Sequence, residues 1–151
     1  YATQTKFLHL ASFVGEKSFQ TQKKLVEVIS KNVKLSLDPG ELYARKGLEA
    51  LGSLVKQTFV LMPNRSELEL LTKKADYREG AEFLLKKGAK MVAVKLGSKG
   101  CYVTDGGFLY GLINDKSLYD CGRIGNFVAS RCIMKMGARP GLPHLNDLKL
   151  G

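Results

Sequence analysis

Hydrophobic and polar residues follow two different periods along this chain. Short apolar runs, typical of strands buried in a parallel sheet, alternate with stretches whose apolar residues recur every three or four positions, as in amphipathic helices. This pattern predicts strands at 7–11, 33–37, 58–62, 91–94 and 101–104, and helices at 17–31, 48–55, 65–72 and 77–87. Three successive βαβ units imply right-handed crossovers. The predicted fold class is α/β, a doubly wound, mainly parallel sheet with helices on both faces.

Turn-forming residues separate these predicted elements. Asp38-Pro39-Gly40 ends one strand, Pro63 ends the next, and Gly88 is placed to cap the helix before it. Gly97-Ser98-Lys99-Gly100 joins two apolar segments, so we expect the strand at 101–104 to pair antiparallel with its predecessor. A capping signal at Ser117 and Asp120 predicts a further helix near the end of the chain.

Composition narrows the class of protein. The 151 residues are 44% hydrophobic and 25% charged, which excludes general disorder, and no apolar run approaches the ~20 residues of a membrane span. Three cysteines without a CxxC pair argue against a disulfide framework or a zinc site, and free thiols fit the cytoplasm. The net charge of +10 comes from scattered lysines, so solvated helix surfaces are favoured over a nucleic-acid interface. A smaller anion such as a nucleotide phosphate is compatible with this charge.

Polar residues follow three of the predicted strands. Ligands of doubly wound sheets bind beyond the carboxyl ends of the strands. Asp38 follows one strand, Asn64 and Glu67 follow the next, one helical turn apart, and the residues at 95–100 follow the third. An amide and a carboxylate so spaced can hold hydrated Mg²⁺ and a phosphate oxygen. They also fit a simple helix capping box, and both interpretations can hold together.

The segment Gly97-Ser98-Lys99-Gly100 allows three interpretations. Its backbone amides and its lysine could face a phosphate. Two glycines also suit an ordinary turn between strands. The GxxG loop of KH RNA-binding domains is a weaker match, because that loop joins two helices.

Three blocks of sequence together carry a family resemblance. The runs LMPNRSEL at 61–68, VKLGSKGCYV at 94–103 and CIMKMGARPGLP at 132–143 resemble, in this order, segments of the ribokinase-like (PfkB) carbohydrate kinases. Asp38-Pro39-Gly40 is similar to the DPN segment of that family. The resemblance extends over almost the whole chain and implies an incomplete ribokinase-like fold. Residues 1–151 then correspond to the carboxy-terminal, nucleotide-binding portion of one such α/β domain.

The resemblance implies ATP-dependent, Mg²⁺-assisted transfer of the γ-phosphoryl group to a hydroxyl of a sugar or nucleoside. Glu67 takes the position of the metal-organising glutamate. Lys95 stands where the family commonly has threonine. The residues implied in ATP binding are Asn64, Lys95, Gly97, Ser98, Lys99, Gly100 and Asn126. The segment matching a K⁺ site in some members contains Cys132, Lys135, Gly137 and Gly141, and the positions expected to border substrate hydroxyls are Ser12 and Asp38.

The family's GAGD motif is absent from this sequence. Its glycines bind developing phosphate charge and its aspartate is the general base, so the chain contains no catalytic base. Asp105-Gly106-Gly107 joins the flanking segments directly. A local hairpin turn is rejected, because the segment at 107–112 resembles the family helix that follows GAGD, and we expect residues to be missing near 105–107. The leading hypothesis is a sugar or nucleoside kinase without a membrane segment, with a homodimer left open. The alternatives are a nucleotide-binding module without catalysis and, less favoured, a basic RNA-binding domain.

Overall fold

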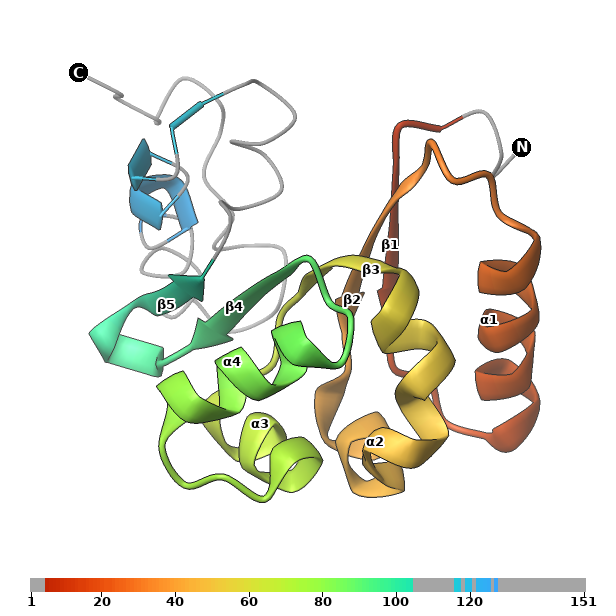
Figure 1. The fold of residues 1–151 in the computed structure, drawn as a ribbon, viewed down its shortest axis with the longest axis horizontal. Helices are drawn as coiled ribbons and strands as arrows, with labels where there is room; N and C mark the ends of the chain where they lie inside the picture. Colours follow the sequence, from red (N-terminus) through yellow and green to blue (C-terminus); the bar gives the residue numbers. More distant parts are fainter. Residues whose placement is uncertain (1–4, 105–115, 118, 121, 126, 128–151) are drawn as a thin grey trace.

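A five-stranded sheet forms the centre of the protein. The computed structural model describes residues 5–104, 116–117, 119–120, 122–125 and 127. The strands are β1 (Phe7–Ala11), β2 (Lys34–Asp38), β3 (Thr58–Leu61), β4 (Met91–Lys95) and β5 (Cys101–Thr104), and they lie side by side in chain order. The first four are parallel, and β5 pairs antiparallel with β4, as the turn at 97–100 predicts (Figure 1).

Helices connect the parallel strands, as expected for βαβ units. They are α1 (Glu16–Val28), α2 (Gly40–Gln57), α3 (Arg65–Thr72) and α4 (Tyr77–Lys86), and a short 3₁₀ turn at Gly97–Lys99 joins β4 to β5. The helical residues at 122–125 lie on the side of β5 away from α4 (Figure 1). The predicted α/β class with a mainly parallel sheet is thus confirmed. The predicted covering of both faces differs for α1–α4, which all lie on one face, because strands in chain order place every right-handed crossover on the same side.

The helix α2 begins earlier than the apolar spacing predicts. The pattern of leucines places a helix at 48–55, whereas α2 extends from Gly40 to Gln57. Gly47 interrupts it with φ 80° and ψ 167°, values outside the helical region. The apolar spacing of Leu48, Leu51 and Leu54 lies after this break, whereas the buried Tyr43 and Ala44 lie before it.

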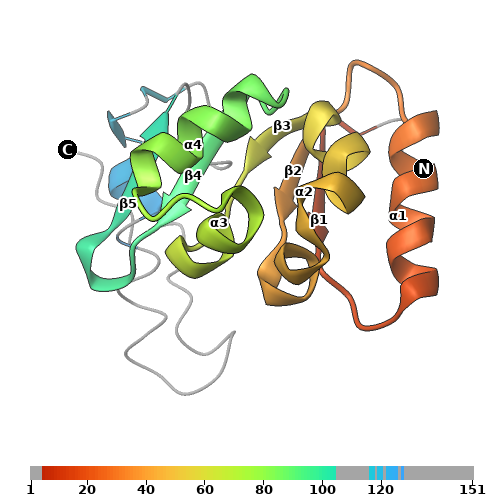
Figure 2. The same ribbon diagram turned by 60° about the horizontal axis from the view of Figure 1, so that its bottom comes forward.

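One hydrophobic core lies between the sheet and α1–α4, which form a single layer over one face (Figure 2). Alternate strand residues point into it, as strand geometry requires. The buried members from the strands are Leu10, Leu35, Leu37, Leu61, Val92 and Val94, and those from the helices include Phe19, Val26, Tyr43, Leu51, Leu54, Val55, Leu68, Leu71, Ala81 and Leu84. Residues of the opposite parity, including Ser36, Asp38 and Lys95, therefore belong to the other face.

A buried glutamine ties α1 to its neighbours. Gln22 is 6% exposed; its Nε2 donates to the carbonyl of Ala11 at 2.9 Å, and its Oε1 accepts from the Tyr43 hydroxyl at 3.2 Å. Burial raises the pKa of Tyr43. Because each polar atom of the pair is satisfied, this contact fixes α1 and α2 to the carboxyl end of β1 without an unpaired buried group.

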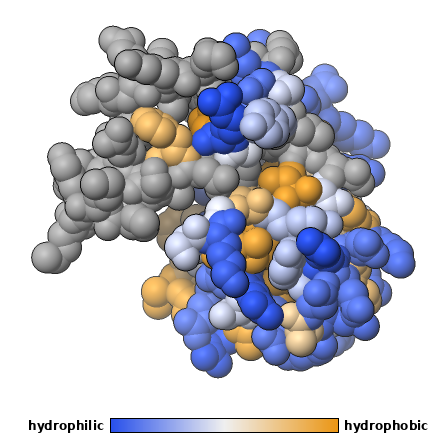
Figure 3. Space-filling model, turned by 90° about the vertical axis from the view of Figure 1, so that its left-hand side faces the viewer, coloured by the Kyte–Doolittle hydropathy of each residue, from blue (hydrophilic) through white to orange (hydrophobic). Residues whose placement is uncertain are grey.

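The charged surface is dispersed, as the sequence predicts. The lysines at 73, 74, 86 and 87 are all exposed at the ends of α3 and α4. On the side shown in Figure 3, hydrophilic side chains predominate among the described residues, and apolar ones form small separate groups. Within the described residues, no helix is long and apolar enough to cross a membrane.

Candidate functional site

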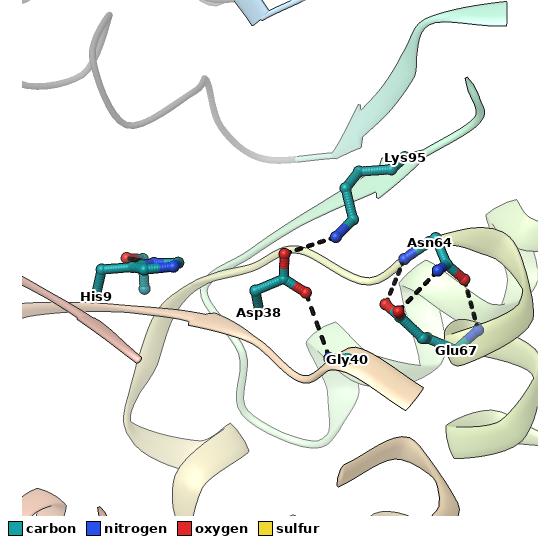
Figure 4. A network of polar contacts seen from close by, with 7 residues as sticks. His9, Asp38, Gly40, Asn64, Glu67 and Lys95 are labelled. Atoms are coloured by element: carbon teal, nitrogen blue, oxygen red, sulfur yellow. Dashed lines mark hydrogen bonds and ion pairs between the residues drawn. The ribbon is translucent and has the colours of Figure 1, made fainter. Parts of the chain in front are cut away.

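An ion pair connects the carboxyl ends of two strands that are not neighbours. Lys95 Nζ, at the end of β4, lies 2.6 Å from Asp38 Oδ2, at the end of β2 (Figure 4). The strand between them is β3, so the lysine side chain crosses the end of β3 to reach the carboxylate. Both side chains remain accessible, at 43% and 33% exposure. The sequence places each residue at a strand end, but it does not predict that they pair.

The second oxygen of Asp38 is held by the backbone. Asp38 Oδ1 accepts from the amide of Gly40 at 3.3 Å, within the turn that starts α2. Gly40 has φ +53°, and a Cβ at this position would overlap Ser12 Oγ. The structure thus brings Ser12 and Asp38, the two residues predicted on the substrate side, to one corner of the site.

The start of α3 is organised by Asn64 and Glu67 (Figure 4). Asn64 Oδ1 accepts from the amide of Glu67 at 2.8 Å, and Glu67 Oε2 accepts from the amide of Asn64 at 2.8 Å. Asn64 Nδ2 also donates to Glu67 Oε1 at 2.7 Å, and Glu67 is only 6% exposed. The capping box predicted from the sequence is confirmed. Each carboxylate oxygen keeps further lone-pair capacity, so the cap does not exclude a metal role.

A cavity of about 520 Å³ opens between the start of α3 and the turn after β4. Lys95 is one of its lining residues, and the amide of Lys95 donates to the carbonyl of Pro63, next to Asn64, at 2.8 Å. Its lining carries three cationic side chains and no carboxylate: Asn64, Arg65, Ser66, Tyr77, Lys95, Leu96, Gly97 and Lys99. Such a cavity favours an anion. A second hollow of about 700 Å³ lies beside it, along α2 and α3, and Glu67 is among its lining residues.

In the glycine-containing turn at 97–100, two backbone amides donate hydrogen bonds to carbonyls of the turn and of the residue before it. The amide of Lys99 donates to the carbonyl of Leu96 at 3.3 Å, and the amide of Gly100 donates to the carbonyl of Gly97 at 3.0 Å. These two amides are therefore engaged within the turn, and the side chains of Lys95 and Lys99 carry the cavity's charge on this side. The turn joins two antiparallel strands, which differs from the helix-joining loop of KH domains.

Another polar pair lies on the same sheet face as Asp38. His9 Nδ1 is 2.9 Å from Ser36 Oγ, and Ser36 is fully buried. In the β1–β2 register, His9 is opposite Ser36 and Ala11 is opposite Asp38. The sequence does not single out His9 or Ser36, because a polar residue within a short apolar run gives no local indication of its cross-strand partner.

The thiol of Cys101 is expected to resist alkylation in the native protein. Cys101 lies opposite Lys95 in the β4–β5 register, and burial raises its pKa to about 12, a change that the Lys95 charge only partly offsets. At pH 8 the thiolate population should be about a thousandfold lower than that of a free cysteine. Peptide mapping after iodoacetamide treatment, with urea-unfolded protein as the control, measures this difference. Equal labelling of Cys101 in both samples would contradict it.

Ionisation of this thiol also makes stability depend on pH. Folding raises the pKa of Cys101 above its value in the unfolded chain. The neutral thiol therefore contributes fully to the free energy of unfolding below about pH 8.5, and this contribution is lost as the pH rises towards 12.

Several predicted positions lie outside the described residues. They are the junction at 105–107, the proposed adenine contact Asn126, and the proposed K⁺ segment with Cys132, Lys135, Gly137 and Gly141. The capping signal after this junction is confirmed, since the amide of Asp120 donates to Ser117 Oγ at 3.1 Å.

Comparison with solved structures identifies the fold. The nucleoside kinase of Methanocaldococcus jannaschii, an archaeal member of the ribokinase family, superposes with a TM-score of 0.76 at 22% identity over 95% of this chain and 55% of its own. The Arabidopsis thaliana ribokinase complexed with ribose and ATP superposes with a TM-score of 0.79 at 21% identity, over 99% of this chain and 58% of its own. The fold is ribokinase-like, and the chain spans little more than half of these structures.

Sequence comparison gives the family. Residues 1–106 match the model of the pfkB family of carbohydrate kinases. An uncharacterized sugar kinase of Archaeoglobus fulgidus is 38% identical over 174 residues, which cover 97% of this chain and 68% of the relative. This chain belongs to the pfkB family of carbohydrate kinases.

Proposed function

We propose that this chain is the nucleotide-binding part of a kinase that transfers the γ-phosphoryl group of ATP to a hydroxyl of a sugar or nucleoside. The observation that carries the proposal is the cavity at the carboxyl edge of the sheet, where Asn64, Lys95 and Lys99 lie together beside Glu67. A polyphosphate carries its negative charge on closely spaced oxygens, and clustered cations in a partly enclosed cavity stabilise such charge.

Residues in and around the cavity have separate roles in this proposal. Lys95 and Lys99 neutralise phosphate oxygens, and Gly97, Ser98 and Gly100 shape the turn that presents Lys99. Asn64 holds Glu67 in place through the capping box. Glu67 offers a single carboxylate, which suits Mg²⁺ held mainly by waters and phosphate oxygens and not by an all-protein cage. When bound, Mg²⁺ would neutralise charge on the transferring phosphoryl group.

The acceptor would bind next to Ser12 and Asp38, at the carboxyl ends of β1 and β2. Support comes from the ribokinase that was solved with ribose and ATP and from the archaeal nucleoside kinase, which share this fold. The proposal extends to Asn126 near the adenine, to K⁺ near Cys132–Gly141, and to a cytoplasmic location.

We also propose that residues are missing at the junction near 105–107, including the general base. Two findings support this. The family match ends at residue 106. The alignment with the archaeal sugar kinase extends over 174 residues although this chain has only 151, so the relative contributes residues that have no counterpart here. The mass of the intact gene product tests the proposal, because 16.6 kDa would leave no room for additional residues.

A phosphorylation screen of the intact gene product with Mg·ATP, over sugars and nucleosides, tests the function directly. Turnover of any acceptor supports the kinase. Binding of ATP without turnover would favour a nucleotide-binding module that lacks catalysis, which is the second candidate because the GAGD motif is absent. RNA binding that competing ATP does not reduce would overturn both.

A further inference from the structure

The position of Lys95 gives it access to both halves of the site. Lys95 lines the proposed phosphate cavity, where its amide donates to the carbonyl of Pro63 and an isolated β-bridge pairs its backbone with that of Asn64. Its side chain ends at Asp38 (Figure 4). Ser12, on the proposed acceptor side, lies against Gly40, whose amide binds Asp38. Lys95 Nζ therefore lies between the proposed donor and acceptor positions, where a transferred phosphoryl group has to pass.

Asp38 is the fixed member of the ion pair. Its Oδ1 is tied to the Gly40 amide, and the side chain has only two rotatable bonds. Lys95 has a flexible four-carbon stem. A carboxylate anchored in this way selects one direction among the many that a lysine side chain can adopt, and so it orients the ammonium group.

The ion pair between Lys95 and Asp38 adds little to the stability of the fold, so stability does not explain its presence. Both side chains are partly exposed, and exposed ion pairs contribute little to the free energy of unfolding. The ammonium group has three donors, of which the contact at 2.6 Å to Asp38 uses one. The remaining donors can bind phosphate oxygens without breaking the pair.

We infer that Lys95 Nζ contacts the terminal phosphoryl group of the nucleotide and that Asp38 is the positioning residue that holds it there. The inference rests on the proposed function and specifies which phosphate Lys95 binds. The threonine common in the family at this position brings no positive charge, so the direct contact with the terminal phosphate is a property of this chain's own lysine.

Binding of Mg·ATP and Mg·ADP, measured by calorimetry on the intact gene product, tests this assignment. Lys95→Met keeps the length of the side chain and removes its charge. It should weaken ATP binding about tenfold or more, as for a lost hydrogen bond to a charged group, and change ADP binding less than about threefold. Lys24→Met, an exposed lysine of α1, is the matched control and should change neither affinity. Equal losses for ATP and ADP would overturn the assignment, since Lys95 would then bind the inner phosphates.

Variants of Asp38 show whether its carboxylate positions Lys95 or only repels the phosphates of the nucleotide. Asp38→Asn should reduce the preference for ATP over ADP towards that of Lys95→Met, and Asp38→Glu, which retains a carboxylate, should restore part of it. If Asp38 acted only as a repelling charge, Asp38→Asn would strengthen ATP binding, and that result would overturn its positioning role. Absence of binding of either nucleotide to the wild-type chain would instead contradict the proposed function.

Discussion

Replacing Glu67 with glutamine is expected to weaken the binding of Mg·ATP by about 10- to 100-fold, the usual cost of losing a group that supports a metal site. Glu67 supplies the one carboxylate of the α3 start, and under the proposed function that charge attracts hydrated Mg²⁺. Glutamine has nearly the same shape but no charge. Calorimetric titration of the chain with ATP, with and without Mg²⁺, measures the effect. The loss should appear only when Mg²⁺ is present.

The same substitution also disturbs the capping box. Both carboxylate oxygens of Glu67 accept hydrogen bonds from Asn64, whereas an amide offers one acceptor and places a donor against the other N–H. We expect a loss of about 1–2 kcal/mol in the free energy of unfolding, measured in urea.

Glu69→Gln is the matched control for Glu67→Gln. Glu69 is an exposed carboxylate on the same helix, so its replacement removes the same charge without touching the cap. It should leave both the Mg²⁺-dependent affinity and the stability nearly unchanged. If Glu67→Gln lowered stability but left the affinity for Mg·ATP intact, Glu67 would be a structural cap and its metal role would be wrong.

Replacing Leu54 with alanine is expected to destabilise the fold by about 3–4 kcal/mol, within the range for leucine truncations in well-packed cores. Leu54 is fully buried in the layer between α2 and the sheet, together with Leu51 and Val55. Four helices and the sheet enclose this layer, so the surroundings can collapse only partly into the space. In a chain of this length the melting temperature should fall by about 10 °C, measurable by circular dichroism.

Leu42→Ala provides the comparison on the same helix. Leu42 is 48% exposed, so truncation removes little buried surface, and we expect a change below about 1 kcal/mol. Equal losses for the two variants would mean that α2 does not pack on the sheet as described.

Local chemistry accounts for the parts of this protein that the sequence predicts well. The strands are short apolar runs that end at Asp38-Pro39-Gly40 and Pro63. The observed strands end at Asp38 and at Leu61, which is two residues before Pro63. The capping box of Asn64 and Glu67 is predictable because its partners are three residues apart and their contact does not depend on the rest of the fold. Gly88, with φ +112°, likewise ends its helix through its own backbone freedom.

The sequence predicts burial less well for polar residues that are buried because they hydrogen-bond to one another. Helical spacing in α1 suggests that Val28 faces the core, but Val28 is 74% exposed and Gln22 is buried. The reason is tertiary, because Gln22 can be buried only where the Ala11 carbonyl and the Tyr43 hydroxyl reach it. A hydrophobicity pattern contains no information about such partners.

The sequence by itself determined the α/β class, the strand ends at which polar residues collect, and the local cap at Asn64. The tertiary structure alone decided that Lys95 reaches Asp38 across β3, that Ser12 lies against Gly40, and that Arg65, Lys95 and Lys99 line one cavity. Lys95 and Asp38 are 57 residues apart in the chain. Strand order and register bring such residues together, and these depend on how the whole apolar core packs.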